Sequence, residues 1–167
     1  MAEEPSFLCD EMLAGLGRWL RIAGYDTAIA DRGRRDRDLV EQANAEKRIL
    51  LTRDRRLNEI RTANDRTLVL ECDGIDAWAT ELVQRLSLDW NRDPLSRCTL
   101  CNVRLGIADR ALIDLLPAQV RALRCSVHVC PRCGRLYWEG SHVRRIRRRL
   151  ARFADDTADR GETRAKA

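Results

Sequence analysis

Two short apolar runs in the first third of the sequence each end at an aspartate. Phe7-Leu8-Cys9 is followed at once by Asp10, and Ile49-Leu50-Leu51 is followed three positions later by Asp54. A short, continuous apolar run is typical of a strand that is buried on both faces, as in a parallel sheet. Because ligands of open α/β sheets bind at the carboxyl ends of the strands, the two aspartates predict a metal site at one edge of such a sheet.

Helical patterns separate these two strands from two further predicted strands. The helix expected after Asp10 carries Leu13, Leu16 and Leu20 at helical spacing and ends before Gly24, which is a favourable C-terminal cap. Strands that alternate with helices predict a parallel α/β sheet with right-handed crossovers. The expected strands are residues 6–9, 26–30, 48–52 and 67–70, and the expected helices are residues 11–23, 36–46, 55–63 and 75–86.

Three aspartates, Asp10, Asp36 and Asp54, fall where predicted helices begin. Each is open to two interpretations. Aspartate is a favoured N-cap residue, which stabilises a helix by about 1 kcal/mol. The starts of crossover helices also gather along one edge of a parallel sheet, and converging carboxylates repel one another unless a hard cation such as Mg²⁺ or Mn²⁺ lies among them. Such an ion activates water and stabilises phosphoryl charge, and Asp38 is a candidate for a further acid of this site.

The charge is unevenly distributed along the chain. Residues 1–90 hold 14 Lys and Arg against 18 Asp and Glu, a net charge of −4, whereas residues 91–167 hold 17 against 8, a net charge of +9. The basic second half suggests an anionic partner such as nucleic acid, and a solvated basic surface is the alternative. Arg18, Arg21 and Arg53 lie near the aspartates in the sequence and are candidates to bind RNA phosphates, or else to pair with neighbouring acids.

Four of the seven cysteines form two Cys-x-x-Cys pairs, at 98–101 and 130–133. Cys98, Cys101, Cys130 and Cys133 are the ligand set of a closed tetrahedral Zn²⁺ site, and a redox-active dithiol in either pair is the alternative. The segment around them is too short to fold on an apolar core of its own, so the zinc is expected to be structural. The stretch 88–95 is expected to link a first domain, residues 6–90, to a second domain, residues 95–153.

Basic and aromatic side chains follow the second cysteine pair. Arg135, Tyr137, Trp138 and His142 are candidates to stack on bases and bind phosphates, although the two aromatic residues would equally complete the core of a zinc ribbon. A helix is expected at residues 143–153, with one apolar face that docks and six arginines. The arginines of this helix are candidates to bind RNA, and a solvated basic face is the alternative.

No apolar run approaches the length of about 18 residues that a membrane-spanning helix needs. The acidic N-terminus lacks a signal-peptide pattern. A cytoplasmic protein without a membrane segment is therefore expected. Residues 154–167 contain few apolar side chains and are expected to form a disordered tail.

Several segments resemble a known family. Three segments resemble the PIN-like RNase domain known as the Mut-seven C-terminal domain: Leu8–Leu13, Arg18–Asp26 and Arg48–Asp54. Their order and spacing match across about residues 6–88. The segment Asp36–Ala43 resembles the acidic helix start of PIN-domain nucleases in general. The cysteine pairs followed by Tyr-Trp-x-Gly-Ser-His at 137–142 resemble the zinc-ribbon tail of the same family, so that the resemblance extends to about residue 150.

The resemblance implies a three-layer α/β nuclease domain followed by a small zinc ribbon. It assigns the acidic roles to Asp10, Asp36 and Asp54, with Asp38 as a substitute or fourth member. The expected function is Mg²⁺- or Mn²⁺-dependent hydrolysis of RNA phosphodiester bonds, with the zinc ribbon aiding RNA binding. Two alternatives are a noncatalytic RNA- or ribosome-binding zinc protein that retains the fold, and a zinc-dependent module that binds an acidic protein.

Overall fold

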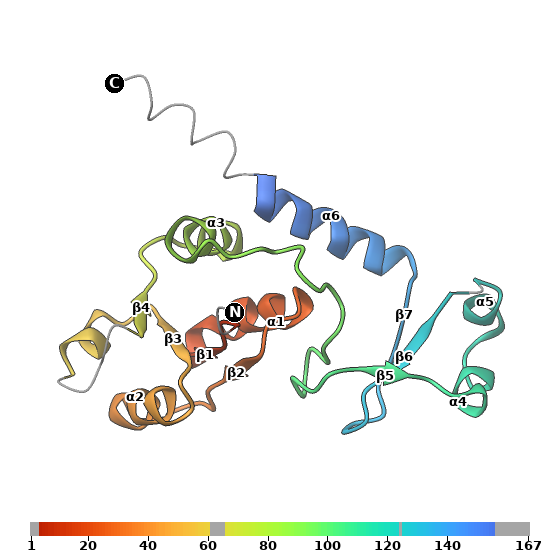
Figure 1. Ribbon diagram of the computed structural model, residues 1–167, viewed down its shortest axis with the longest axis horizontal. Helices are drawn as coiled ribbons and strands as arrows, with labels where there is room; N and C mark the ends of the chain where they lie inside the picture. Colours follow the sequence, from red (N-terminus) through yellow and green to blue (C-terminus); the bar gives the residue numbers. More distant parts are fainter. Residues whose placement is uncertain (1–3, 61–65, 124, 156–167) are drawn as a thin grey trace, which may run out of the picture.

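Four short parallel strands form the central sheet of the first half of the chain (Figure 1). The computed structural model describes residues 4–60, 66–123 and 125–155. Cys9 pairs with Leu51, so the carboxyl ends of the first and third strands lie side by side. The strands lie in the order β2-β1-β3-β4, where β1 is Phe7–Cys9, β2 is Thr27–Ile29, β3 is Ile49–Thr52 and β4 is Thr67–Val69.

Helical segments follow the strands. The predicted helix at 11–23 begins as a 3₁₀ turn, η1 (Glu11–Leu13), and continues as α1 (Ala14–Ile22). The helices α2 (Asp36–Ala45) and α3 (Ile75–Leu86) end within one residue of their predicted bounds. The short helix predicted at 55–63 forms as a 3₁₀ helix, η2 (Arg55–Glu59), and residues 61–65 lie outside the described residues.

Alternating strand residues divide the first half of the chain into three layers. Phe7, Cys9 and Leu51 pack with α1 and α3 in one core. Leu8 and Leu50, on the opposite face of the sheet, pack with α2 and η2 in a second core. Strands buried on both faces produce continuous apolar runs. The expected α/β class, with helices on both faces of a parallel sheet, is therefore confirmed (Figure 1).

A small antiparallel sheet forms the second half of the chain. It has the order β5-β6-β7, where β5 is Gly106–Ile107, β6 is Val127–Val129 and β7 is Leu136–Trp138. Two short helices, α4 (Arg110–Asp114) and α5 (Ala118–Arg121), lie between β5 and β6. Among the described residues of this part, the buried apolar cluster contains Ala108, Leu116 and Val127, with a shell of partly buried apolar residues.

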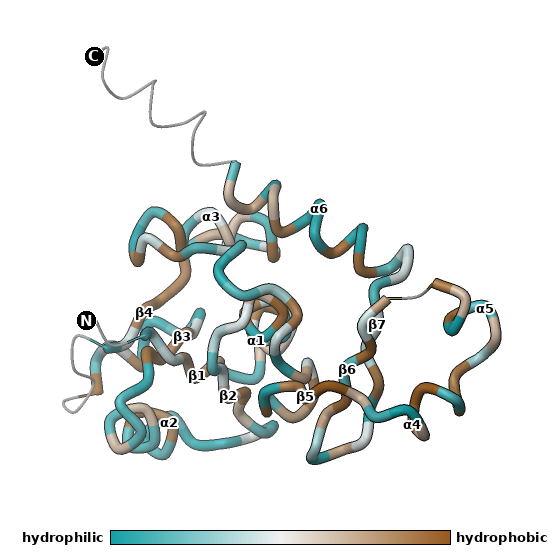
Figure 2. Tube along the Cα trace, turned by 45° about the vertical axis from the view of Figure 1, so that its right-hand side comes forward, coloured by the Kyte–Doolittle hydropathy of each residue, from teal (hydrophilic) through white to brown (hydrophobic). Residues whose placement is uncertain are grey.

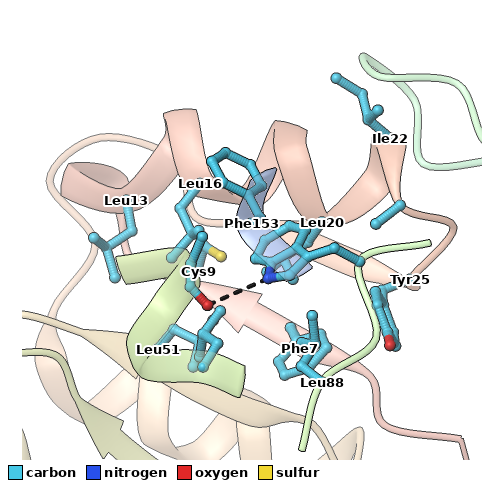
Figure 3. Packing of buried hydrophobic residues seen from close by; sticks show 14 of the residues in the cluster. Phe7, Cys9, Leu13, Leu16, Leu20, Ile22, Tyr25, Leu51, Leu88 and Phe153 are labelled. Atoms are coloured by element: carbon cyan, nitrogen blue, oxygen red, sulfur yellow. Dashed lines mark hydrogen bonds between the residues drawn. The ribbon is translucent and has the colours of Figure 1, made fainter. Parts of the chain in front are cut away.

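The last helix, α6 (Ser141–Asp155), returns from β7 to the first half of the chain (Figure 1). Leu150 and Phe153 are buried in the same core as Phe7 and the leucines of α1 (Figure 3). The Phe153 ring makes edge-on contacts with Trp19 and Trp90, at centroid distances of 5.4 and 5.0 Å. The apolar face of the helix thus packs in the core that β1, α1 and α3 form.

Polar contacts also join the ribbon to the first domain. Buried Arg21 of α1 donates from Nε to the Thr27 carbonyl oxygen (2.8 Å) and from Nη1 to the carbonyl oxygens of Thr99 and Leu100 (2.9 and 2.7 Å). Asn102 accepts a hydrogen bond from the Thr27 amide and donates one to Asp26. The first cysteine pair is thus held directly against β2. None of the helices in the described ranges is both long enough and apolar enough to span a bilayer.

Candidate functional site

Two aspartates at the carboxyl ends of β1 and β3 are joined by one buried threonine. Thr52, which is fully buried, donates its hydroxyl proton to Asp10 Oδ2 at 2.9 Å and accepts a hydrogen bond from the Asp54 amide at 3.0 Å. The Asp10 amide donates to the Leu51 carbonyl oxygen, so the ladder between the strands fixes the position of this residue. The pairing register therefore places Asp10 beside the β3 end that carries Asp54.

The two acids differ in what their side chains do. Asp54 caps η2, because its Oδ1 accepts a hydrogen bond from the Arg56 amide at 2.9 Å. Asp10 precedes η1 but makes no side-chain cap hydrogen bond. The residue is only 9% exposed, and its carboxylate accepts a hydrogen bond from Thr52 instead. The helix-capping interpretation thus holds for Asp54 and does not account for Asp10.

The remaining predicted acids lie at the start of α2. Asp36 is exposed, and Asp38 accepts two hydrogen bonds from Arg35 at 2.9 Å, which lower the pKa of its carboxyl group. The loop before α2 is tied to the β1 edge, because Glu11 Oε2 accepts a hydrogen bond from the Gly33 amide at 2.7 Å. Within residues 4–60, 66–123 and 125–155, the aspartates do not form a group of three or more that could hold a metal ion.

The arginines predicted to bind RNA occupy three different environments. Arg18 is exposed on α1, whereas the donors of Arg21 are directed to carbonyl oxygens between the domains. Arg53 pairs with Asp73 at 2.5 Å and lies 6.0 Å from the Trp78 ring. Its Nε is buried and has no partner in the described part of the chain.

Two basic residues that the sequence analysis did not single out follow the candidate site directly. Arg55 and Arg56 are exposed immediately after Asp54. Their positions in the sequence, one and two residues beyond a strand-end aspartate, were the available signal. Charged side chains at the start of a short helix are common on any surface, so the signal was weak.

The four predicted zinc ligands come together in the ribbon. One sulfur atom from each of the four cysteines lies within 4.8 Å of the others, and Cys98 Sγ is 3.8 Å from Cys133 Sγ. A tetrahedral site with Zn–S bonds of about 2.3 Å has sulfur–sulfur edges of about 3.8 Å. All four thiols are free. The donor set and its spacing fit a closed tetrahedral metal centre.

Hydrogen bonds within this centre shift the pKa values of Cys98 and Cys101 in opposite directions. Burial raises the pKa of Cys98, but hydrogen bonds from the Tyr137 hydroxyl (3.1 Å) and from the amides of Cys101 and Leu100 outweigh it and lower that pKa to about 6. The hydrogen bond with Cys133, burial and the neighbouring Cys98 raise the pKa of Cys101 to about 12. A cation among the sulfur atoms would favour the thiolate form of these cysteines.

The residues after the second cysteine pair divide between structure and surface. Tyr137 bonds to Cys98 and to Thr99, and Trp138 packs on the small core of the ribbon. Arg135 and His142 are exposed. Both aromatic side chains thus contribute to the ribbon itself, as the structural alternative predicted.

Comparison with known proteins decides the family. A family model described as the Mut7-C RNAse domain matches residues 5–150. The chain belongs to this family. A search of the curated proteins and a search of the solved structures each found no match.

The Mut7-C match spans both halves of the chain, including the Asp10–Thr52–Asp54 edge and the four cysteines. The resemblance noted from the sequence is confirmed. A Mut7-C RNAse domain indicates a ribonuclease-type function with RNA as the substrate.

Proposed function

We propose that this Mut7-C protein is an Mg²⁺- or Mn²⁺-dependent ribonuclease whose catalytic edge is formed by Asp10, Thr52 and Asp54. The observation that carries the proposal is the position of Asp10, a nearly buried residue at the end of β1. Asp10 makes no cap hydrogen bond and is instead coupled through Thr52 to the strand end that bears Asp54. Burying a charge costs free energy unless it is both hydrogen-bonded and paired. Asp10 accepts a hydrogen bond from Thr52 but forms no ion pair with a described residue, so a cation at this strand end would stabilise its charge.

The donor set suits a hard cation. Mg²⁺ is usually held by one or two carboxylates together with water and substrate phosphate oxygens, and Asp10 and Asp54 provide two carboxylates at neighbouring strand ends. Asp36 is the proposed third acid, on the helix whose preceding loop is tied to Glu11. Asp38 is a weaker candidate because Arg35 already engages both of its oxygens. When bound, such an ion supplies an activated water and neutralises charge on the phosphoryl group.

The protein's own residues orient the reactants. The hydroxyl of Thr52 fixes the rotamer of Asp10 and holds the backbone of Asp54 at the same time. Arg18, Arg55 and Arg56 are exposed and are proposed to pair with the phosphates of the RNA. Arg53 is held by Asp73 and is proposed to shape the edge rather than to contact the substrate.

We further propose that the four cysteines hold a structural Zn²⁺. A ribbon core of three buried apolar residues is small, and zinc binding would supply the missing stability. Free thiols of this kind fit the reducing conditions of the cytoplasm. Purified protein should contain one zinc per chain, and Cys130→Ser should lose the metal and lower the unfolding temperature. Metal-free wild type with an unchanged unfolding temperature would contradict the proposal.

The nuclease proposal is tested by cleavage of a labelled mixed-sequence RNA. Wild type should cleave when Mg²⁺ or Mn²⁺ is added and should not cleave without it. A chelator is avoided because it would also remove zinc from the ribbon. Asp10→Asn keeps the shape of the side chain and an acceptor for Thr52, and it should abolish cleavage while RNA binding persists. Equal cleavage by the two proteins would contradict the assignment of Asp10.

A second candidate function is noncatalytic RNA binding by a protein that retains the fold. One observation favours it: Asp10, Asp36 and Asp54 do not form a single carboxylate group within the described residues. Under this alternative, wild type binds RNA but does not cleave it at any concentration of Mg²⁺ or Mn²⁺.

A further inference from the structure

The exposed face of α6 carries a row of arginines. Arg144, Arg148 and Arg152 recur every four residues, which places them on one side of the helix along about 12 Å of its axis. Arg145 lies beside them, and all four side chains are exposed. We call these four residues the arginine row. The opposite side of the helix carries Leu150 and Phe153, which are buried against the first domain.

Within the described ranges, the arginine row has no acidic partner. The other two arginines of the helix do have them: Arg147 pairs with Glu139, and Arg149 pairs with Asp76, both at 3.2 Å. For the row itself, the contacts within the described ranges are from Arg148 Nε to the Arg144 carbonyl oxygen and between Arg145 and His142. Like charges four residues apart destabilise a helix by about 0.2–0.5 kcal/mol per pair. An anion bound along the row would relieve this repulsion.

The row is fixed in position relative to the proposed catalytic edge. The Arg149 guanidinium lies 5.0 Å from the Trp19 ring centroid and pairs with Asp76, in the first turn of α3. Asp73, three residues earlier, pairs with Arg53, the neighbour of Asp54. Figures 1 and 2 show α6 extending from β7 to α3, with hydrophilic segments alternating along it. A ligand on the row would therefore be held at a constant distance from the edge.

We propose that the arginine row binds the phosphate backbone of the substrate RNA outside the cleavage site. This inference rests on the proposed ribonuclease function. The row would contribute substrate affinity without a role in the chemical step, because phosphate contacts position a nucleic acid and carry no sequence information.

Other partners fit this face less well. An amphipathic helix binds a membrane through its apolar side, and that side of α6 is buried in the protein. A folded protein partner would be anchored by apolar or aromatic contacts at the centre of the interface. None of the large exposed apolar residues in the described part of the chain lies on α6. A flexible polyanion such as RNA requires only positive charges on the protein surface, and the arginine row provides them.

The test measures RNA affinity in the Asp10→Asn background, so that no cleavage occurs. The row variant is Arg144→Gln, Arg148→Gln and Arg152→Gln together. The control is Arg66→Gln, Arg110→Gln and Arg121→Gln, which removes the same charge from exposed arginines on other elements. Fluorescence anisotropy of a labelled single-stranded RNA is recorded from 50 to 200 mM salt, and circular dichroism verifies that both variants are folded.

The row variant should bind about tenfold more weakly at 50 mM salt, and the slope of log affinity against log salt should fall by roughly 2, since three phosphate contacts are lost. The control should change affinity by less than about threefold. An equal loss in both variants, or no loss in the row variant, would overturn the proposal. So would equally tight binding of polyglutamate, which would point to an acidic protein.

Cleavage kinetics separate this inference from the nuclease proposal. With Asp10 intact, the row variant should raise KM and leave kcat unchanged. If wild type does not cleave, the nuclease proposal fails, yet the affinity measurement still decides whether the row binds RNA.

Discussion

Thr52 is the residue on which the account of the site depends most. A hydroxyl has a single proton to donate, and here the proton goes to Asp10 while the oxygen accepts from the Asp54 amide. Both partners are therefore fixed by one side chain that is fully buried. A threonine at a strand end is common, and only the pairing of β1 with β3 reveals that this one bridges two neighbouring strands.

We predict that Thr52→Val slows single-turnover RNA cleavage by about 10–100-fold, because Asp10 and Asp54 would lose the hydroxyl that positions them. Each factor of ten corresponds to an increase of about 1.4 kcal/mol in the activation free energy. Thr52→Ser keeps the hydroxyl and should cleave within about threefold of wild type. The valine variant should also unfold at a lower denaturant concentration. Its free energy of unfolding should fall by about 1–3 kcal/mol, because the Asp54 amide loses its acceptor. Cleavage by the valine variant at the wild-type rate would contradict the role assigned to Thr52.

Arg21 shows where local sequence reasoning fails at the scale of a residue. Its proximity to Asp10 in the sequence suggested a contact with RNA. Its guanidinium instead donates to Thr99 and Leu100, which are 78 and 79 residues away in the sequence. Only tertiary structure reveals those carbonyl groups, and with 7% exposure the side chain has little surface for a ligand.

We predict that Arg21→Ala lowers the free energy of unfolding by about 2–4 kcal/mol, because three carbonyl oxygens lose a charged donor. Arg18→Ala, one turn earlier on α1 and exposed, should change it by less than about 0.5 kcal/mol. Urea denaturation monitored by tryptophan fluorescence measures both values. Equal effects of the two substitutions would show that Arg21 does not hold the ribbon against the first domain.

At the scale of elements, the sequence predicted well what depends on local pattern. The strands around Phe7 and Leu50 and the helix at 75–86 follow from apolar spacing, which the two cores confirm. The sequence predicted that the apolar face of α6 docks, but not what it docks against, because the aromatic partners of Phe153 lie on α1 and after α3. Nor could the relation of Asp36 to the strand ends be predicted, since the loop before α2 determines it.

The two glycines inside α1 provide a matched test of helix packing against the sheet. A Cβ at Gly17 would lie 2.7 Å from Ile29 Cγ1 and 3.2 Å from Cys9 Sγ, whereas a Cβ at Gly15 would meet only Ile75 Cδ1, at 3.4 Å. We predict that Gly17→Ala destabilises the protein by about 1–3 kcal/mol through overpacking. Gly15→Ala should stabilise it by about 0.5–1 kcal/mol, because alanine is the better helix former. Thermal unfolding of the two variants tests this prediction. Equal shifts of the unfolding temperature in the same direction would contradict this description of the interface between α1 and the sheet.

At the scale of the whole molecule, the two halves of the chain are joined by two separate sets of contacts. The ribbon is held to β2 by Arg21 and Asn102, and α6 then returns from the ribbon to the core of the first domain. We propose that residues 6–90 form the nuclease unit, that the ribbon follows from residue 95, and that α6 completes the nuclease core. The arginine row and the aspartate edge are thereby carried on one body.

The most direct test of the central claim compares two aspartates that both cap helices. Asp54 caps η2 and Asp109 caps α4, each through a hydrogen bond of 2.9 Å to a backbone amide. Asp54→Asn and Asp109→Asn preserve the cap, since asparagine is equally favoured there, and should unfold at nearly the same temperature as wild type. RNA cleavage should be lost with Asp54→Asn and retained with Asp109→Asn. If both variants cleave like wild type, Asp54 is only a helix cap and the catalytic edge proposed here is wrong.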